Sequence, residues 1–183
     1  MNIFIIHGAC GHPQENWFPW LKLELEKLGH SVLVPAFPTP KRHSLDSWME
    51  VMRPYLGEID SDTVFVAHSM GPAFVLSLLE ILEVRVKACV FVAGFIGKLG
   101  IPEFDSINAS FMEKGFNWEK IRENCGAFYM YASENDPYVP LELEKELARR
   151  LGAELILVKD AGHFNEKAGY TSFPELSELV AEL

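Results

Sequence analysis

The segment of residues 63–79, TVFVAHSMGPAFVLSLL, constrains the fold of this chain more than any other. It opens with a short apolar, β-branched run, and Pro72 stands where a helix would begin, since proline is favoured in the first helical turn. Apolar residues then recur with i, i+3, i+4, i+7 spacing, which is typical of a helix with one face in a core, at Val75, Leu78, Leu79 and Leu82. No charged residue occurs in the segment. We therefore expect a buried strand that turns sharply into a buried helix.

Ser69 lies on this turn. A serine between a strand and a helix is typical of the nucleophile elbow of α/β-hydrolases, which holds the hydroxyl at the edge of a parallel sheet. The residues two positions before and after the serine have to be small where strand and helix converge, and here they are Ala67 and Gly71. The same short pattern also fits an ordinary helix-capping serine. The rest of the chain therefore has to supply a base and a carboxylate.

Strand and helix patterns alternate along the whole chain. Apolar runs predict strands at 2–6, 31–34, 63–67, 85–93, 127–131 and 155–158. Helical periodicity and punctuation by Pro and Gly predict helices at 17–29, 45–56, from 72, 118–124, 141–151 and 174–183. This alternation predicts an α/β fold with about six parallel strands and helices on both faces, in a single domain of residues 1–183. Residues 94–118 are rich in aromatic side chains and lack clear periodicity, so they are a candidate short lid or an ordered excursion on the sheet.

Composition and charge exclude several classes of partner. A net charge of −10 argues against nucleic acid and anionic membranes, both of which require basic patches. The three cysteines have neither disulfide nor zinc-ligand spacing, which favours reduced thiols in a cytoplasmic protein and no metal site. The N-terminal run MNIFIIHGACG is neither a signal peptide nor a membrane span. We expect no cofactor, and the sequence identifies no protein partner.

His163 is the strongest candidate for the base that would activate Ser69. A serine hydroxyl needs a base with a pKa near neutrality, and His163 follows the last predicted strand, directly after a glycine. His7 is expected to order the loop after the first strand, and His68 to point away from the serine hydroxyl. The others offer no comparable position; in particular, solvent-exposed turns are expected at His30 and His43.

The carboxylate that orients the base should lie between the serine and the histidine in chain order. Asp136 follows the fifth predicted strand, and Pro137 keeps it out of helical conformation. Its task would be to accept the second imidazole N–H and to stabilise the imidazolium. Glu134 and Asp160 are rival carboxylates, and Asp160 is the stronger rival because it lies only three residues before His163.

A developing oxyanion would need two backbone N–H donors. One should follow the nucleophile, at Met70, and one should lie in the loop after the first strand, where Ala9 fits and Gly8 allows a close approach. Loss of one such donor costs roughly 2.7–4 kcal/mol of transition-state stabilisation.

The motifs together resemble those of a known family. IIHGACG followed by NWFPWLK, then VAHSMG, SENDPYVP and GHFNEKAGYTSFPEL, are similar to the small serine hydrolases of the retinoblastoma-binding protein 9 type, a compact branch of the α/β-hydrolase superfamily. The resemblance covers essentially the whole chain and implies a triad of Ser69, Asp136 and His163. It also implies a minimal sheet that begins at the oxyanion strand. The chain has no LxCxE-type sequence, so retinoblastoma binding is not implied.

The sequence thus predicts a serine hydrolase acting on a small ester or acyl substrate through an acyl-enzyme, and leaves amides and thioesters open. One alternative is a weakly catalytic or non-catalytic interaction protein on the same fold. A nucleotide-binding protein is disfavoured because Gly8 and Gly11 do not complete G-x-G-x-x-G and no P-loop lysine follows. A cysteine hydrolase using Cys10 is weaker still, since no ordered base is near it in the sequence.

Overall fold

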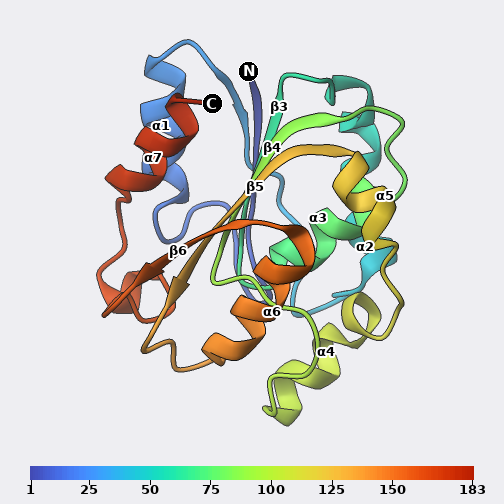
Figure 1. Cartoon of the computed structure of the whole chain (residues 1–183), viewed down its shortest axis with the longest axis vertical. Helices are drawn as coiled ribbons and strands as arrows, with labels where there is room; N and C mark the ends of the chain where they lie inside the picture. Colours follow the sequence, from blue (N-terminus) through green and yellow to red (C-terminus); the bar gives the residue numbers. More distant parts are fainter.

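A parallel sheet of six strands forms the centre of the protein, in a computed structural model that describes residues 1–183 (Figure 1). The strand order is β2-β1-β3-β4-β5-β6, and every neighbouring pair is parallel. The strands are β1 (Asn2–Ile6), β2 (Ser31–Leu33), β3 (Thr63–His68), β4 (Val86–Val92), β5 (Cys125–Ser133) and β6 (Glu154–Val158). β3 and β4 lie in the middle of the sheet and are almost wholly buried, which explains their continuous apolar runs. The expected sheet is confirmed.

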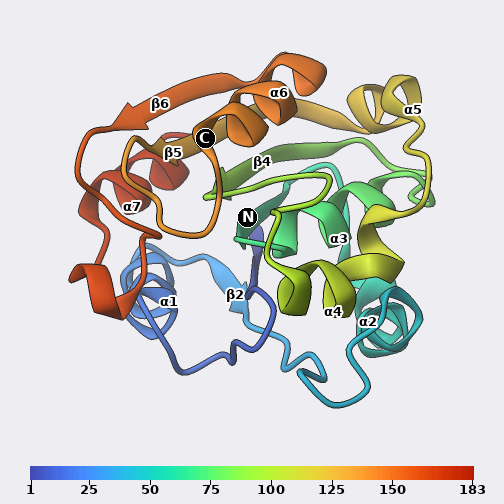
Figure 2. The same cartoon turned by 90° about the horizontal axis from the view of Figure 1, so that it is seen from below.

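Helices cover both faces of this sheet. Figures 1 and 2 show α1 and α7 on one face and the other helices on the opposite face. The helices are α1 (Phe18–Lys27), α2 (Leu45–Met52), α3 (Gly71–Leu79), α4 (Pro102–Met112), α5 (Trp118–Glu123), α6 (Leu141–Leu151) and α7 (Pro174–Ala181), with short 3-10 helices η1 (Arg53–Glu58) and η2 (Glu166–Ala168). None of them has the length and apolarity that crossing a bilayer requires.

Each face of the sheet carries its own core. The larger cluster, of 29 buried residues, fills the face under α2, α3, α5 and α6 and includes Trp48 and Phe74. The smaller cluster, of 19 buried residues, lies under α1 and α7 and includes Trp17 and Phe18. Strand residues alternate between the two clusters, as the side-chain period of two requires.

The structure corrects several of the sequence-based boundaries. The helix predicted at 45–56 ends at Met52 and continues as η1, because Pro54 cannot continue an α-helical hydrogen-bond ladder. The region 94–118 is not irregular throughout, since it contains α4. Its helical signal is weak because a polar residue, Asn108, is buried beside Phe111 on the inward face.

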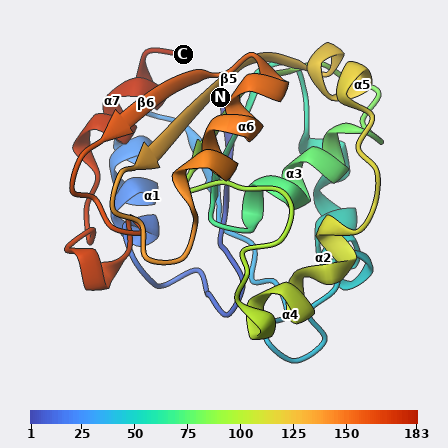
Figure 3. The ribbon, with the colours of Figure 1, turned by 60° about the horizontal axis from the view of Figure 1, so that its bottom comes forward.

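The strands place their carboxyl ends at one edge of the sheet. In register, Ile6 of β1 is paired with Ala67 of β3, and His68 with Val92 of β4. Figure 3 shows α4 at the lower end of the molecule, below α3. Residues of the loops that follow β1, β3, β4, β5 and β6 line one cavity together with Phe104 and Asn108 of α4, at the sheet edge where ligands bind in open α/β sheets.

Candidate active site

Ser69 occupies a tight turn between β3 and α3. Its φ angle is +59°, a left-handed conformation that non-glycine residues adopt at a cost, and its N–H donates to the Val92 carbonyl at 2.9 Å. Neither Gly8 nor Gly71, which lie next to this turn, has space for a side chain. A Cβ at Gly71 would lie 2.8 Å from the Ile6 carbonyl oxygen, and a Cβ at Gly8 would lie 2.8 Å from the Cβ of Ser69. The strained turn is therefore held by β1 and β4 on both sides.

The structure brings Ser69, His163 and Asp136 into one hydrogen-bonded row. His163 Nε2 lies 3.0 Å from Ser69 Oγ, and His163 Nδ1 lies 2.7 Å from Asp136 Oδ2. The carboxylate accepts the Nδ1–H, which leaves Nε2 as the acceptor for the serine hydroxyl. This is the geometry that proton removal from Ser69 requires.

Asp136 is held in place by the backbone that follows it. Its Oδ1 accepts from the N–H groups of Tyr138 and Val139 at 2.8 and 3.0 Å. Its side chain is 0% exposed, and that of His163 is 10% exposed. The rival carboxylates Glu134 and Asp160 are exposed, and neither contacts His163. Proximity in the sequence therefore does not select the partner of His163.

Two residues that sequence reasoning did not assign hold the His163 loop. The Asn135 side-chain oxygen accepts from the N–H of Gly162 at 2.7 Å and from the hydroxyl of Ser133 at 2.8 Å. His68 donates from Nε2 to the His163 carbonyl at 2.9 Å. Burial, together with the neighbouring His163, lowers the pKa of His68 to about 3, so its ring stays neutral. The Ser-Glu-Asn-Asp run could have indicated such a turn-forming side chain.

His7 orders the loop after β1. Its Nε2 accepts from the N–H of Phe37 at 3.1 Å, so its Nδ1 carries the proton and donates to the Gly8 carbonyl at 2.8 Å. Burial lowers the pKa of His7 to about 4, although the bond to Gly8 opposes the shift. Because the N–H of Ala9 belongs to the same peptide plane as the Gly8 carbonyl, this bond also fixes the direction of that N–H.

The two expected backbone donors flank Ser69. Ala9 lines the cavity next to the serine, and Met70 follows the serine at the start of α3. Neither N–H donates to another group of the protein. Their role as donors to an oxygen bound near Ser69 stays a prediction.

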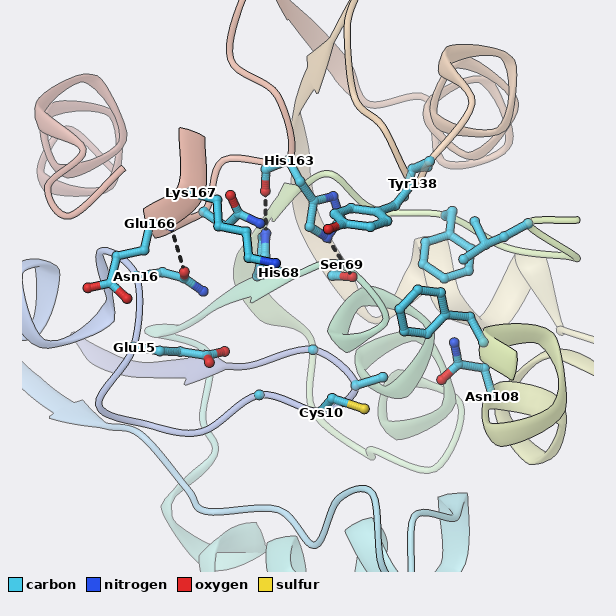
Figure 4. Close-up of a pocket in the computed structure, with 18 residues that line it drawn as sticks. Cys10, Glu15, Asn16, His68, Ser69, Asn108, Tyr138, His163, Glu166 and Lys167 are labelled. Atoms are coloured by element: carbon cyan, nitrogen blue, oxygen red, sulfur yellow. Dashed lines mark hydrogen bonds between the residues drawn. The ribbon is translucent and has the colours of Figure 1, made fainter. Parts of the chain in front are cut away.

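Ser69 opens into a cavity of about 380 Å³ with two unlike sides. One side is apolar and comes from the segment around α4 and the loop after Asp136, with Phe95, Leu99, Phe104, Tyr138 and Val139. The other side is polar and comes from the loops before α1 and around η2, with Glu15, Asn16, Asn165, Glu166 and Lys167. Figure 4 shows Tyr138 and Asn108 on one side of Ser69 and Glu15, Asn16 and Glu166 on the other.

His43 is not in a solvent-exposed turn. It is half-buried between Trp48 and Phe111, with ring centroids at 5.3 and 5.0 Å, because α4 covers it. Cys10 is exposed and lines the same cavity, but no histidine hydrogen-bonds to it, and His163 Nε2 contacts Ser69 Oγ.

Comparisons with known proteins agree with this architecture. The model of the serine hydrolase family matches residues 3–182. The YdeN protein of Bacillus subtilis is 33% identical over 180 residues, covering 97% of this chain and 93% of that protein. Serine hydrolase RBBP9 of Rattus norvegicus is 28% identical over 178 residues, covering 97% of this chain and 91% of that protein.

Solved structures show the same fold. The crystal structure of the ydeN gene product of Bacillus subtilis superposes with a TM-score of 0.92 at 30% identity, covering 99% of this chain and 97% of that one. Polyneuridine aldehyde esterase shares the fold alone, with a TM-score of 0.72 at 13% identity over 99% of this chain and 98% of that chain. With a family match over nearly its whole length and an α/β-hydrolase sheet, the chain belongs to the serine hydrolase family.

Proposed function

We propose that this hydrolase cleaves small carboxylic esters through an acyl-enzyme on Ser69, with His163 as the base and Asp136 as the residue that orients it. The observation that carries the proposal is the continuous row of hydrogen bonds from Ser69 Oγ through the His163 ring to Asp136. Amides and thioesters share the acyl chemistry and remain within the proposal.

In the first half of the reaction, Ser69 Oγ attacks the carbonyl carbon while His163 Nε2 takes the hydroxyl proton. Asp136 accepts the Nδ1–H throughout and stabilises the imidazolium. The N–H groups of Ala9 and Met70 donate to the carbonyl oxygen as it gains negative charge. His163 then returns the proton to the leaving oxygen, the C–O bond breaks, and the acyl group stays on Ser69.

Water completes the cycle in the second half. His163 takes a proton from the water, the resulting hydroxide attacks the acyl carbon, and the proton passes to Ser69 Oγ as the acid leaves. His7 and His68 take no proton in this scheme, because burial lowers the pKa of both rings well below neutrality.

The two sides of the cavity suggest how an ester would lie in it. The acyl group stays on Ser69 until deacylation, so it suits the buried side, where Phe95 and Val139 are 2% and 1% exposed. The leaving group has to diffuse away, which suits the side formed by the exposed residues Glu166 and Lys167. In this arrangement α4 acts as a short lid over the acyl group. The limited volume favours short acyl chains.

The test is labelling and hydrolysis by Ser69→Ala. We expect labelling by a fluorophosphonate probe to fall to background and hydrolysis of p-nitrophenyl acetate to fall at least about 10³-fold, because no other group replaces the nucleophile. Cys10→Ala is the matched control in the same cavity, and it should keep both activities. Labelling that survives Ser69→Ala, or a folded wild type that neither labels nor turns over, would overturn the proposal.

A further inference from the structure

The apolar side of the cavity contains one deeply buried polar side chain. Asn108 lies on the inward face of α4, is only 3% exposed and lines the cavity. Its neighbours along the same side are Phe95, Leu99 and Phe104. A buried amide among such groups is unfavourable unless each of its polar atoms finds a partner.

The oxygen of this amide has its partner inside the protein. His43 Nε2 lies 3.1 Å from Asn108 Oδ1 and donates its proton to it. His43 is itself held between Trp48 and Phe111. An amide oxygen only accepts, so Nε2 carries the proton of this contact, and the other ring nitrogen, Nδ1, is buried without a hydrogen-bond partner. Burial lowers the pKa of His43. The hydrogen bond from His43 therefore holds the amide of Asn108 in one orientation.

The nitrogen of the same amide has no partner inside the protein. No acceptor of the chain lies within hydrogen-bond distance of Asn108 Nδ2, and this atom is not sealed off from the cavity. Figure 4 shows Asn108 on the same side of Ser69 as Tyr138. The cavity thus presents one oriented N–H₂ donor within otherwise apolar surroundings.

From this arrangement we infer that Asn108 determines specificity: the preferred acyl chain is apolar but carries one hydrogen-bond acceptor, such as an ether or keto oxygen, that meets the Asn108 amide. The inference rests on the proposed acyl-enzyme at Ser69. A site built to donate to a substrate atom rejects an analogue that lacks the atom, because its own polar group is then left unpaired.

The experiment compares p-nitrophenyl esters in pairs that differ only by an ether oxygen in place of a methylene. The pairs are methoxyacetate with butyrate, β-methoxypropanoate with pentanoate, and γ-methoxybutanoate with hexanoate. For each pair, the ratio of the two kcat/KM values is measured in wild type and in Asn108→Leu. Dividing one ratio by the other cancels the intrinsic reactivity of the esters.

We expect the ether-to-methylene ratio to fall about tenfold in Asn108→Leu for at least one of the pairs, the one whose oxygen reaches the amide. Asn108→Ala removes the amide without introducing another donor, so it should show the same fall and keeps the test valid if the leucine variant folds poorly. Ser110→Ala is the control on the same helix. Its hydroxyl accepts from the N–H of Leu45 at 3.0 Å and does not line the cavity, so its ratios should match wild type.

The outcomes separate this inference from the proposed function. If wild type hydrolyses the esters and all ratios stay unchanged in both Asn108 variants, the inference is wrong while the acyl-enzyme at Ser69 stands. If folded wild type hydrolyses none of the esters, the proposed function fails and the inference fails with it.

Discussion

Asp136 and Glu144 are two buried carboxyl groups in unlike surroundings. Asp136 accepts three hydrogen bonds, from His163 and from two backbone N–H groups. Glu144, in the first turn of α6, is 0% exposed, and neither of its carboxyl oxygens has a hydrogen-bond partner. Burial, followed by the neighbouring Asp136, raises the pKa of Glu144 from 4.5 to about 9, although the backbone of Ser133 nearby opposes the shift. Near neutral pH Glu144 is therefore protonated in the folded protein.

This environment makes Glu144 a source of pH-dependent instability. Below pH 4.5 Glu144 is protonated in both the folded and the unfolded chain, so its titration does not change the free energy of unfolding. Between pH 4.5 and about 9 the unfolded chain releases the proton and the folded chain keeps it, so stability falls as pH rises. We expect Glu144→Gln to raise the free energy of unfolding by roughly 1–3 kcal/mol at pH 8, with a smaller gain at pH 5.

Urea unfolding across this pH range measures the effect. Glu142→Gln is the matched control, because Glu142 is in the same turn but its side chain is 81% exposed and contacts only Lys145. It should change stability little and without a pH trend. A gain in Glu144→Gln that is equal at pH 5 and pH 8 would contradict the assignment of a raised pKa.

At the scale of elements, the junction of β1, β3 and α3 positions the nucleophile. α3 starts directly against β1, and Gly71 allows this approach. We expect Gly71→Ala to lower the free energy of unfolding by about 1–3 kcal/mol, because the new methyl group would lie 2.8 Å from the Ile6 carbonyl oxygen and 3.0 Å from that of His7. The shift of β1 should also lower kcat at least about tenfold, since His7 and Gly8 belong to the loop beside Ser69.

Gly57→Ala provides the comparison for this substitution. A Cβ at Gly57 meets nothing within 4 Å, so that variant should stay within about 0.5 kcal/mol of wild type. Urea midpoints compare the stability of the two variants, and turnover of p-nitrophenyl acetate compares their activity. Equal stability and activity would show that the elbow tolerates a larger residue.

α4 shows why one element escaped prediction. Its first turn is well marked, with Pro102 near the start and Asp105 accepting from the N–H groups of Leu99 and Gly100 at 2.6 and 3.0 Å. Its buried face, however, consists of Asn108 and Phe111 rather than an apolar stripe. The partner that satisfies Asn108 is His43, 65 residues away in the sequence. Local periodicity contains no information about such a partner.

At the scale of the whole molecule, the sheet is buried between two cores that share its strands. We propose that residues 1–183 form one cooperative domain, because removal of either core would expose an apolar face of the same sheet. Leu76→Ala and Leu176→Ala each truncate a fully buried side chain, one on each face. Each should lower the free energy of unfolding by about 2–5 kcal/mol.

Two probes measured together test this cooperativity. Far-UV circular dichroism reports the helices, and tryptophan fluorescence reports both faces, since Trp48 lies in the larger core and Trp17 in the smaller one. In both variants the two probes should move to one lower midpoint. Separate transitions for the two probes would show that the faces unfold independently.

The sequence by itself determined the six strands and the helices other than α4, the strand-to-helix turn at Ser69, and the place of His163 after the last strand. These features follow from local patterns: apolar runs, small residues beside a serine, and a histidine after the last strand. The sequence also favoured Asp136 over Asp160 as the partner of His163, and the structure shows that contact. Tertiary structure alone decided that Asn135 and His68 hold the His163 loop and that His43 contacts the amide of Asn108. These contacts join residues that are 27 to 95 positions apart in the chain, and the packing of whole loops against the sheet, rather than any local pattern, brings them within hydrogen-bond distance.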